Sequence, residues 1–314
     1  MSGRLREIAR QTVAIAEAGR YRNGVGDEVG IGGAVRAAVA GTRHYLPDET
    51  LVVGDTEPGV GRVEVTYEST LQAAFRLGPG AACLVFASAK NPGGGFLGGA
   101  KAQEESIARS SARYQCLLVA PEFYAFHRGQ RDLRYSDRVI YSPGVPVFRD
   151  DKGNLLDQPY TTSFLTAAAP NLGAVVRNQP VDAADVPAVL VRRARRVLEV
   201  AAAHGHRTIV LGAWGCGVSA TIPLRWLARS PRRCTWSTDS TTWCSPSAMA
   251  YRAHPCIARS RNAFSELPRN RRLRAGAMSR PGLVETPTRL GAAQVVIGPC
   301  EDRRRDWMEL QRSP

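Results

Sequence analysis

Apolar residues recur at helix and strand spacings through the first two thirds of the chain. Their spacing predicts an amphipathic helix over residues 3–18 and a second helical run near residues 34–39. Strands are predicted at residues 51–53, 62–66, 83–88, 137–148, 161–168 and 208–213. Further helices are predicted at residues 69–76, 103–119 and 186–203. Strands and helices alternate, which favours an α/β sandwich.

A glycine-rich loop follows the apolar strand at residues 83–88. It contains Asn91-Pro92 and three consecutive glycines, and the next helix begins with Gln103-Glu104-Glu105. Glycines let backbone N–H groups approach an anion closely, because no Cβ atom intervenes and positive φ is not penalised. The loop therefore predicts a phosphate site, and the two carboxyl groups beside it add acid and base capacity.

A second glycine-bearing loop, residues 214–218, follows the predicted strand at residues 208–213. In an open α/β sheet, ligands bind at the carboxyl ends of the strands. We therefore expect the two loops to face one crevice. Cys216 in this loop is either a nucleophile or a small buried thiol, and the tight turn with no neighbouring histidine favours the thiol.

Two other interpretations of the first loop stay open. Gly93, Gly95 and Gly98 fit the spacing of a dinucleotide-binding turn, although Asn91-Pro92 and the late position in the chain disfavour it. The two glutamates also suit the first turn of any helix, where the helix dipole favours acidic residues. Adjacent helical residues point about 100° apart. One carboxyl group would therefore transfer the proton while the other binds.

The composition of the 314-residue chain indicates a protein of the cytoplasm. The apolar runs are too short to cross a bilayer, and the first twenty residues resemble no signal peptide. The seven cysteines form neither a CxxC pair nor a metal-ligand spacing, which is typical of reduced thiols. We expect no membrane association, no metal and no cofactor.

The net charge of +14 is concentrated in the last third of the chain. Residues 1–218 hold 25 basic and 21 acidic side chains, whereas residues 219–314 hold 17 and 7. We therefore divide the chain into a folded domain at residues 1–218, which includes N-terminal helices at residues 1–45, and an irregular or disordered basic tail at residues 219–314.

The loop and helix start resemble a known family. Three glycines, seven intervening residues and Gln-Glu-Glu are similar to the signature of the bacterial poly(ADP-ribose) glycohydrolases, which are built on a macrodomain. Further similar segments lie at residues 14–21, 65–74, 86–111, 137–151, 161–171 and 204–218. The resemblance thus covers almost all of residues 1–218.

The resemblance implies a macrodomain-like three-layer sandwich with a mixed sheet and an N-terminal helical extension. It implies hydrolysis of the 1″–2′ ribose–ribose bonds of poly(ADP-ribose), which releases ADP-ribose and reverses protein ADP-ribosylation. Glu105 matches the catalytic acid and Glu104 matches the residue that holds ribose hydroxyls. Asn91 matches a contact to the distal ribose, and no cofactor is required.

The remaining implied contacts concern the diphosphate and the partners. One side of the diphosphate would lie under Gly93, Gly94, Gly95 and Phe96, and the other under Gly215, Cys216, Gly217 and Val218. Gln103 belongs to the same implied substrate-binding set. The partners would be poly(ADP-ribose) and ADP-ribosylated proteins, and we expect a monomer.

The resemblance ends after Val218. The family pattern continues with a phenylalanine that packs against the nucleotide, whereas this chain has Ser219. Residues 219–280 hold twelve arginines and nine serines but two acids. We interpret this composition as a frameshift near codon 219 that removes an edge strand and a covering helix. The alternatives are a basic extension that binds nucleic acid or the polymer, and a macrodomain that binds ADP-ribose without cleaving it.

Overall fold

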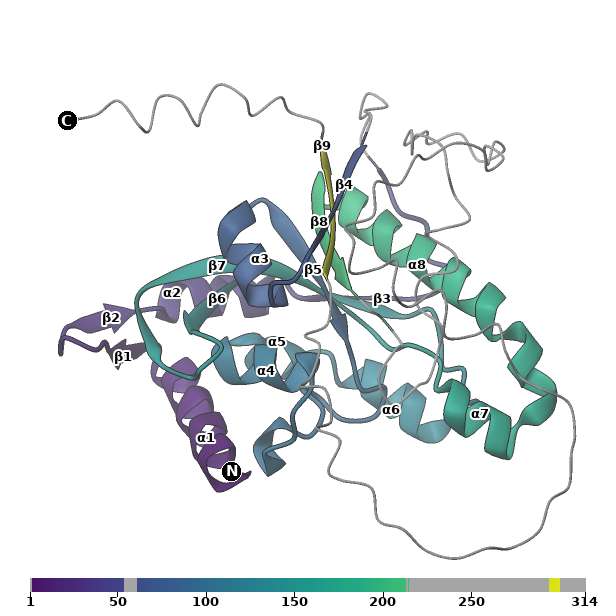
Figure 1. Cartoon of the computed structure of the whole chain (residues 1–314), viewed down its shortest axis with the longest axis horizontal. Coiled ribbons are helices and arrows are strands. Elements are labelled where there is room, and N and C mark those ends of the chain that lie inside the picture. The colour runs from purple at the N-terminus through teal and green to yellow at the C-terminus, as the bar shows by residue number, and fades with distance from the viewer. Residues whose placement is uncertain (1, 54–60, 213, 215–293, 300–314) are drawn as a thin grey trace, which may run out of the picture. The chain divides into compact units, whose positions relative to one another are not determined.

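The computed structural model describes residues 2–53, 61–212, 214 and 294–299 of the chain. Its main feature is a seven-stranded mixed sheet in the order β3-β6-β7-β5-β8-β9-β4 (Figure 1). The strands are β3 (Arg43–Tyr45), β4 (Gly61–Thr66), β5 (Ala81–Phe86), β6 (Val139–Arg149), β7 (Leu155–Ala167), β8 (Thr208–Gly212) and β9 (Gln294–Pro299). The central strands β7, β5 and β8 run parallel, and the other neighbouring pairs are antiparallel.

Helices pack on both faces of the sheet, as the three-layer prediction requires. On one face lie α1 (Ser2–Ala18), α2 (Gly32–Ala40), α3 (Thr70–Leu77), α4 (Gln103–Ser110) and α5 (Arg113–Leu118). The other face is covered by α8 (Val186–Ala203). Because side chains alternate along a strand, Cys83 and Val85 of β5 join the first core while Ala82 and Leu84 join the second.

The remaining elements lie around this sandwich. A two-stranded ribbon, β1 (Arg20–Arg22) and β2 (Glu28–Gly30), connects α1 to α2. The short helices are α6 (Pro121–Gly129), α7 (Leu172–Asn178) and two 3₁₀ segments, η1 (Phe96–Gly98) and η2 (Pro180–Asp185). Among the described residues, no helix is both long enough and apolar enough to span a bilayer.

Two predicted elements differ in the structure. The helix expected over residues 103–119 is broken into α4 and α5 at Ser111, whose backbone is extended (φ −143°, ψ 168°) and bridges to Val147. The strand expected at residues 51–53 does not form. Leu51 packs into the core under α8 whereas Val52 is 86% exposed, so this run is a connecting segment.

Strand β9 lies within the segment that the sequence analysis expects to be irregular. It pairs antiparallel with β8 on one side and β4 on the other, so this part of the segment is regular and lies inside the sheet. The run Gln294-Val295-Val296-Ile297 is rich in β-branched residues, which favour strands. The rest of the tail, residues 219–293 and 300–314, lies outside the described residues.

A buried histidine anchors α6 to the segment before β6. His127 is fully buried, and its Nε2 atom lies 3.3 Å from the N–H of Ser136, which donates to it. Nδ1 is 2.7 Å from the carbonyl oxygen of Phe123 and therefore carries the proton. Burial, with added repulsion from Arg193 and Arg138, lowers the pKa of His127 to about 4. The folded protein thus keeps a neutral ring well below the pH at which an unfolded histidine charges.

We expect acid to destabilise the fold through His127. Because its folded pKa is depressed, its contribution is complete above the unfolded value of about 6.5 and is lost as pH falls toward 4. Between pH 7 and 5 the loss is about 1–2 kcal/mol, after allowance for partial solvent screening. Urea denaturation of the wild type and of His127→Gln at both pH values measures it. An equal loss of stability in the two proteins would contradict this assignment.

Candidate active site

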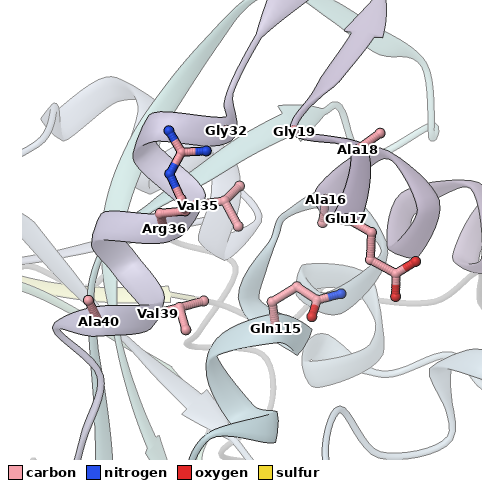
Figure 2. A pocket seen from close by; sticks show the side chains of 10 residues that line it. All are labelled: Ala16, Glu17, Ala18, Gly19, Gly32, Val35, Arg36, Val39, Ala40 and Gln115. Atoms are coloured by element: carbon pink, nitrogen blue, oxygen red, sulfur yellow. The ribbon is translucent and has the colours of Figure 1, made fainter.

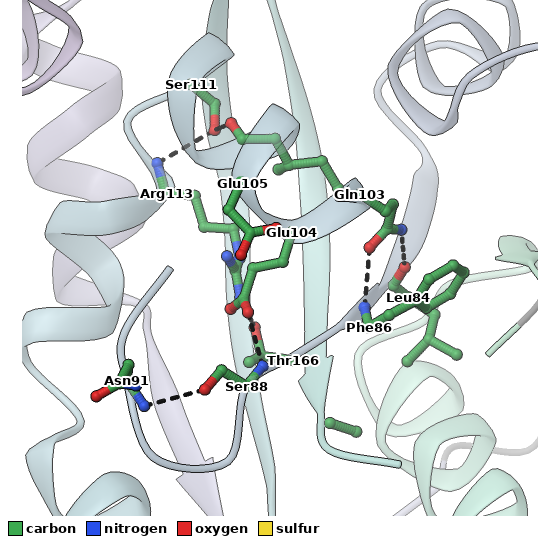
Figure 3. A network of polar contacts seen from close by, with 12 residues as sticks. Leu84, Phe86, Ser88, Asn91, Gln103, Glu104, Glu105, Ser111, Arg113 and Thr166 are labelled. Carbon is green, nitrogen blue, oxygen red and sulfur yellow. Dashed lines mark hydrogen bonds and ion pairs between the residues drawn. The ribbon is translucent and has the colours of Figure 1, made fainter. Parts of the chain in front are cut away.

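The first residue of helix α4 ties the helix to the end of β5. Gln103 Oε1 accepts the N–H of Phe86 (2.9 Å), and its Nε2 donates to the carbonyl oxygen of Leu84 (2.8 Å) and to Thr70 Oγ1 (3.1 Å). Figure 3 shows the Gln103 amide against the backbone of β5. The side chain assigned to the substrate from the sequence is therefore engaged within the protein, and its observed work is to position α4.

Glu104 is buried and held at both carboxyl oxygens (Figure 3). Oε2 accepts the backbone N–H of Ser88, the second residue after β5, at 2.6 Å. Oε1 lies 3.3 Å from Nη2 of Arg113, which also donates to Thr166 Oγ1 at 3.0 Å. The carboxyl group of Glu104 is thus fixed by a loop, a helix and a strand together.

Burial dominates the ionisation of Glu104. Loss of solvent raises its pKa to about 7, against the lowering influence of Arg113 and of the Ser88 N–H, while nearby Glu105 raises it further. A carboxyl group with a pKa near 7 exchanges protons in the physiological range. Glu104 therefore combines a fixed position with a titration near neutral pH.

Glu105 is half-buried, and its two carboxyl oxygens have different hydrogen-bond environments. Oε1 accepts the N–H of Gly95 at 3.0 Å. Oε2 is buried and has no hydrogen-bond partner in the described part of the chain. The structure brings the two glutamates and the glycine loop together, as the sequence analysis expects.

The glycine loop must lie against the carboxyl groups, and this excludes a side chain at its centre. Gly94 has φ of +61°, and a Cβ atom there would overlap Glu105 Oε1 and lie 3.0 Å from Glu104 Oε2. Gly93 has φ of +69°, and a Cβ atom there would lie 2.9 Å from the ring of Phe96. The glycines therefore provide room for the carboxyl groups and for Phe96, which the phosphate argument did not anticipate.

The backbone N–H groups of the loop donate within the protein. Gly94 N–H donates to the carbonyl oxygen of Asn91 (3.0 Å), Gly95 N–H to Glu105, and Phe96 N–H to the carbonyl oxygen of Gly93 (3.3 Å). Contact between these three groups and a diphosphate requires that these hydrogen bonds be exchanged. The sequence analysis expected N–H groups of this loop to approach a phosphate.

Phe96 and Asn91, two other residues predicted to contact the substrate, differ in burial. The ring of Phe96 is fully buried against Tyr114, with ring centroids 4.9 Å apart, and against α1, so it anchors the loop and does not face a ligand. Asn91 is exposed, and its backbone N–H donates to Ser88 Oγ at 3.2 Å. The side chain of Asn91 is therefore accessible at the mouth of the loop.

The second predicted loop is described at its first residue alone. Trp214 follows β8, and its Nε1 donates to the carbonyl oxygen of Ala167 at the end of β7 (3.2 Å). Gly215, Cys216, Gly217 and Val218 lie outside the described residues. Because β8 runs parallel to β5, residue 214 leaves the sheet at the carboxyl end of its strand, the same end at which the first glycine loop follows β5.

The structure adds two residues to the site that the sequence analysis missed, Arg113 and Thr166. Arg113 follows Glu104 by nine positions, a spacing that a continuous helix would not bring together. The break at Ser111 turns the chain back and brings the guanidinium to the carboxyl group. No signal in the residue pattern marks that break.

In the part of the chain that the structure describes, one cavity lies away from the two glutamates. A cavity of about 510 Å³ lies between α1, α2 and α5, and its lining includes Ala16, Val35, Arg36 and Gln115 but neither glutamate of the site (Figure 2). Within the described ranges, no group of three or more His, Cys, Asp or Glu side chains is placed to hold a metal ion.

We expect Gly94→Ala to destabilise the fold by about 1–3 kcal/mol, because the methyl group meets both carboxyl groups and positive φ is strained. Gly98→Ala is the matched control, since its Cβ atom would meet nothing within 4 Å. That control should change the free energy of unfolding by less than about 1 kcal/mol. Denaturant titration of both variants measures the difference, and equal midpoints would refute the steric argument.

Comparison of the sequence with known families gives one match. The sequence model of the family described as "Microbial-type PARG, catalytic domain" matches residues 9–150. No curated protein sequence matches the chain.

Solved structures give broader matches. The crystal structure of poly(ADP-ribose) glycohydrolase (PARG) from Thermomonospora curvata is 49% identical, with a TM-score of 0.63 over 70% of this chain and 83% of that one. The structure of that enzyme bound to the inhibitor ADP-HPD is 50% identical over the same shares, with a TM-score of 0.63. PARG from Deinococcus radiodurans in complex with ADP-ribose is 44% identical, with a TM-score of 0.55 over 62% of this chain and 81% of that one. Given this identity and coverage, the chain belongs to the microbial-type poly(ADP-ribose) glycohydrolase family.

Proposed function

We propose that this chain hydrolyses the 1″–2′ ribose–ribose bonds of poly(ADP-ribose) and releases ADP-ribose. The observation that carries the proposal is the pair of carboxyl groups packed against Gly94, with one held at both oxygens and the other holding a buried oxygen without a partner. Relatives of this chain were crystallised with ADP-ribose and with the inhibitor ADP-HPD.

Glu105 is the proposed general acid. The Gly95 N–H occupies Oε1, so Oε2, which has no hydrogen-bond partner in the described part of the chain, would carry the proton for the leaving group. Protonation of the 2′-oxygen breaks the bond to C1″ and leaves an oxocarbenium-like centre. Water then adds its hydroxyl to C1″ and returns a proton to Glu105. A single carboxyl group serves both steps, because the second carboxyl group is bound elsewhere.

Glu104 is the proposed anchor for the ribose hydroxyls. A carboxylate accepts hydrogen bonds from hydroxyls, and Ser88 and Arg113 fix this one so that it needs no rearrangement when substrate arrives. Its negative charge also stabilises the positive charge that develops on the ribose ring. Glu104 thus contributes to catalysis by position and charge.

The rest of the substrate is assigned by the family resemblance. Asn91 would contact the distal ribose with its accessible amide, and the two loops at residues 93–96 and 215–218 would enclose the diphosphate. The proposed binding partners are poly(ADP-ribose) and ADP-ribosylated proteins. We propose that the protein binds them as a monomer in the cytoplasm. A reaction of this kind reverses protein ADP-ribosylation.

We expect Glu105→Gln to lower the release of ADP-ribose by about 100-fold or more, because general acid catalysis is worth about 10²–10⁴. The assay uses purified poly(ADP-ribose) and the full chain, and it detects free ADP-ribose. Glu122→Gln is the matched control, since Glu122 is also an acidic residue in the first turn of a helix but is exposed. The control should keep the wild-type rate.

Two outcomes would overturn the proposal. Wild-type rates in Glu105→Gln would remove Glu105 from the acid role. A folded wild type that binds ADP-ribose but releases none from the polymer would assign a binding function without cleavage, the alternative that Ser219 favours.

A further inference from the structure

We infer that Arg113 is a positioning residue for the reaction and holds the carboxylate of Glu104 in place for the substrate ribose. The inference rests on the proposed function. It concerns a residue that touches neither the acid Glu105 nor, by its burial, the solvent. Arg113 acts through Glu104.

The chain directs the Arg113 guanidinium to this one carboxyl group. The extended backbone at Ser111 ends α4, and Ser111 Oγ donates to the carbonyl oxygen of Ile107 (2.7 Å) while it accepts the N–H of Arg113 (3.3 Å). The side chain then runs under α4, where Nη2 lies 3.3 Å from Glu104 Oε1 and 3.0 Å from Thr166 Oγ1 (Figure 3). Three elements, α4, α5 and β7, converge there.

The pair is a poor device for stability alone. Arg113 is 0% exposed, and its Nε and Nη1 have no hydrogen-bond partner among the described residues. A buried charge is costly when its donors are not satisfied, and an apolar side chain of similar volume is often as stabilising or more so. We therefore explain the guanidinium at this position by its charge, which holds the carboxylate of Glu104 in place.

Another buried arginine of the same protein shows the contrast. Arg193 of α8 is equally buried, and it donates from Nε to Asp137 (2.9 Å) and from Nη1 to the carbonyl oxygen of Ala168 (2.6 Å). Those contacts join α8 to the segments beside β6 and β7. Arg113 instead contacts Thr166 Oγ1 and the carboxyl group of Glu104. In the described part of the chain, no other positive side chain pairs with that carboxyl group.

The charge of Arg113 favours the ionised form of Glu104, which burial opposes. The other groups that act on Glu104 are Glu105 beside it on α4, the Ser88 N–H after β5, and Tyr124 of α6, whose buried hydroxyl interacts electrostatically with both Glu104 and Arg113. Arg113 is the single positive charge in that set. Its removal should make Glu104 keep its proton to higher pH and loosen its orientation.

The test measures kcat and KM for poly(ADP-ribose) from about pH 5 to pH 9 in the full chain with Arg113→Leu and Arg113→Lys. We expect Arg113→Leu to lower kcat about 10–100-fold near neutral pH, with a smaller change in KM, and to shift the acid limb of the pH profile upward by about one unit. Arg113→Lys keeps the positive charge and should restore most of kcat and the wild-type limb.

Matched controls separate positioning from folding. Arg196→Leu removes another buried guanidinium, one that donates to the carbonyl oxygens of Leu46 and Glu49, and should leave the pH profile unchanged. If Arg113→Leu does not fold, Thr166→Val removes the second acceptor of Nη2 and should shift the acid limb in the same direction by a smaller amount.

A wild-type pH profile and kcat in folded Arg113→Leu would overturn the inference. The pH dependence of ADP-ribose affinity, measured by calorimetry, gives a second readout that does not need turnover. If the wild type releases no ADP-ribose, the proposed function fails, while a shift of this binding profile in Arg113→Leu would still support the role of Arg113. The same binding profile in both proteins would refute it.

Discussion

A buried carboxyl group, that of Glu104, is the constraint on which the site depends. A buried carboxylate without hydrogen bonds is costly, so the fold must supply donors from several directions. The turn after β5 supplies the Ser88 N–H, and α5 supplies Arg113, which is itself held by Thr166 of β7. The loop at Gly94 passes so close that no side chain fits between loop and carboxyl group. The geometry of the site therefore depends on several elements at the carboxyl ends of β5 and β7 and not on one motif.

The residue pattern was sufficient for the layers and for the centre of the site. The apolar run of β5, the glycines after it and the acidic start of α4 are local signals, and the structure places them as predicted. The family resemblance then gave the chemistry, because its motif is a contiguous stretch that carries loop and carboxyl groups together. Such contiguous patterns can be interpreted from the sequence alone, because they do not depend on tertiary contacts.

The remaining features depend on tertiary contacts that no local pattern encodes. Gln103 lies in the motif, yet its hydrogen bonds go to Leu84, Phe86 and Thr70. Arg113 reaches Glu104 because the helix breaks at Ser111, where a contact to Val147 replaces the next helical turn. Likewise, burial of Phe96 follows from the position of α1, far away in the sequence. Each of these side chains has its role set by a partner distant along the chain.

Strand β9 has a consequence for the order in which the chain assembles. Among the described strands, β4 joins the sheet through β9, and about 230 positions separate the two along the chain. Ribosomal synthesis at about 5–20 residues per second delays the partner by about 10–50 s. During that interval β4 has no strand beside it, and its Val63 and Val65 are about 40% exposed even in the finished fold. Nascent chains of this protein therefore present β4 without a neighbouring strand until β9 has been synthesised, and slower translation lengthens that interval.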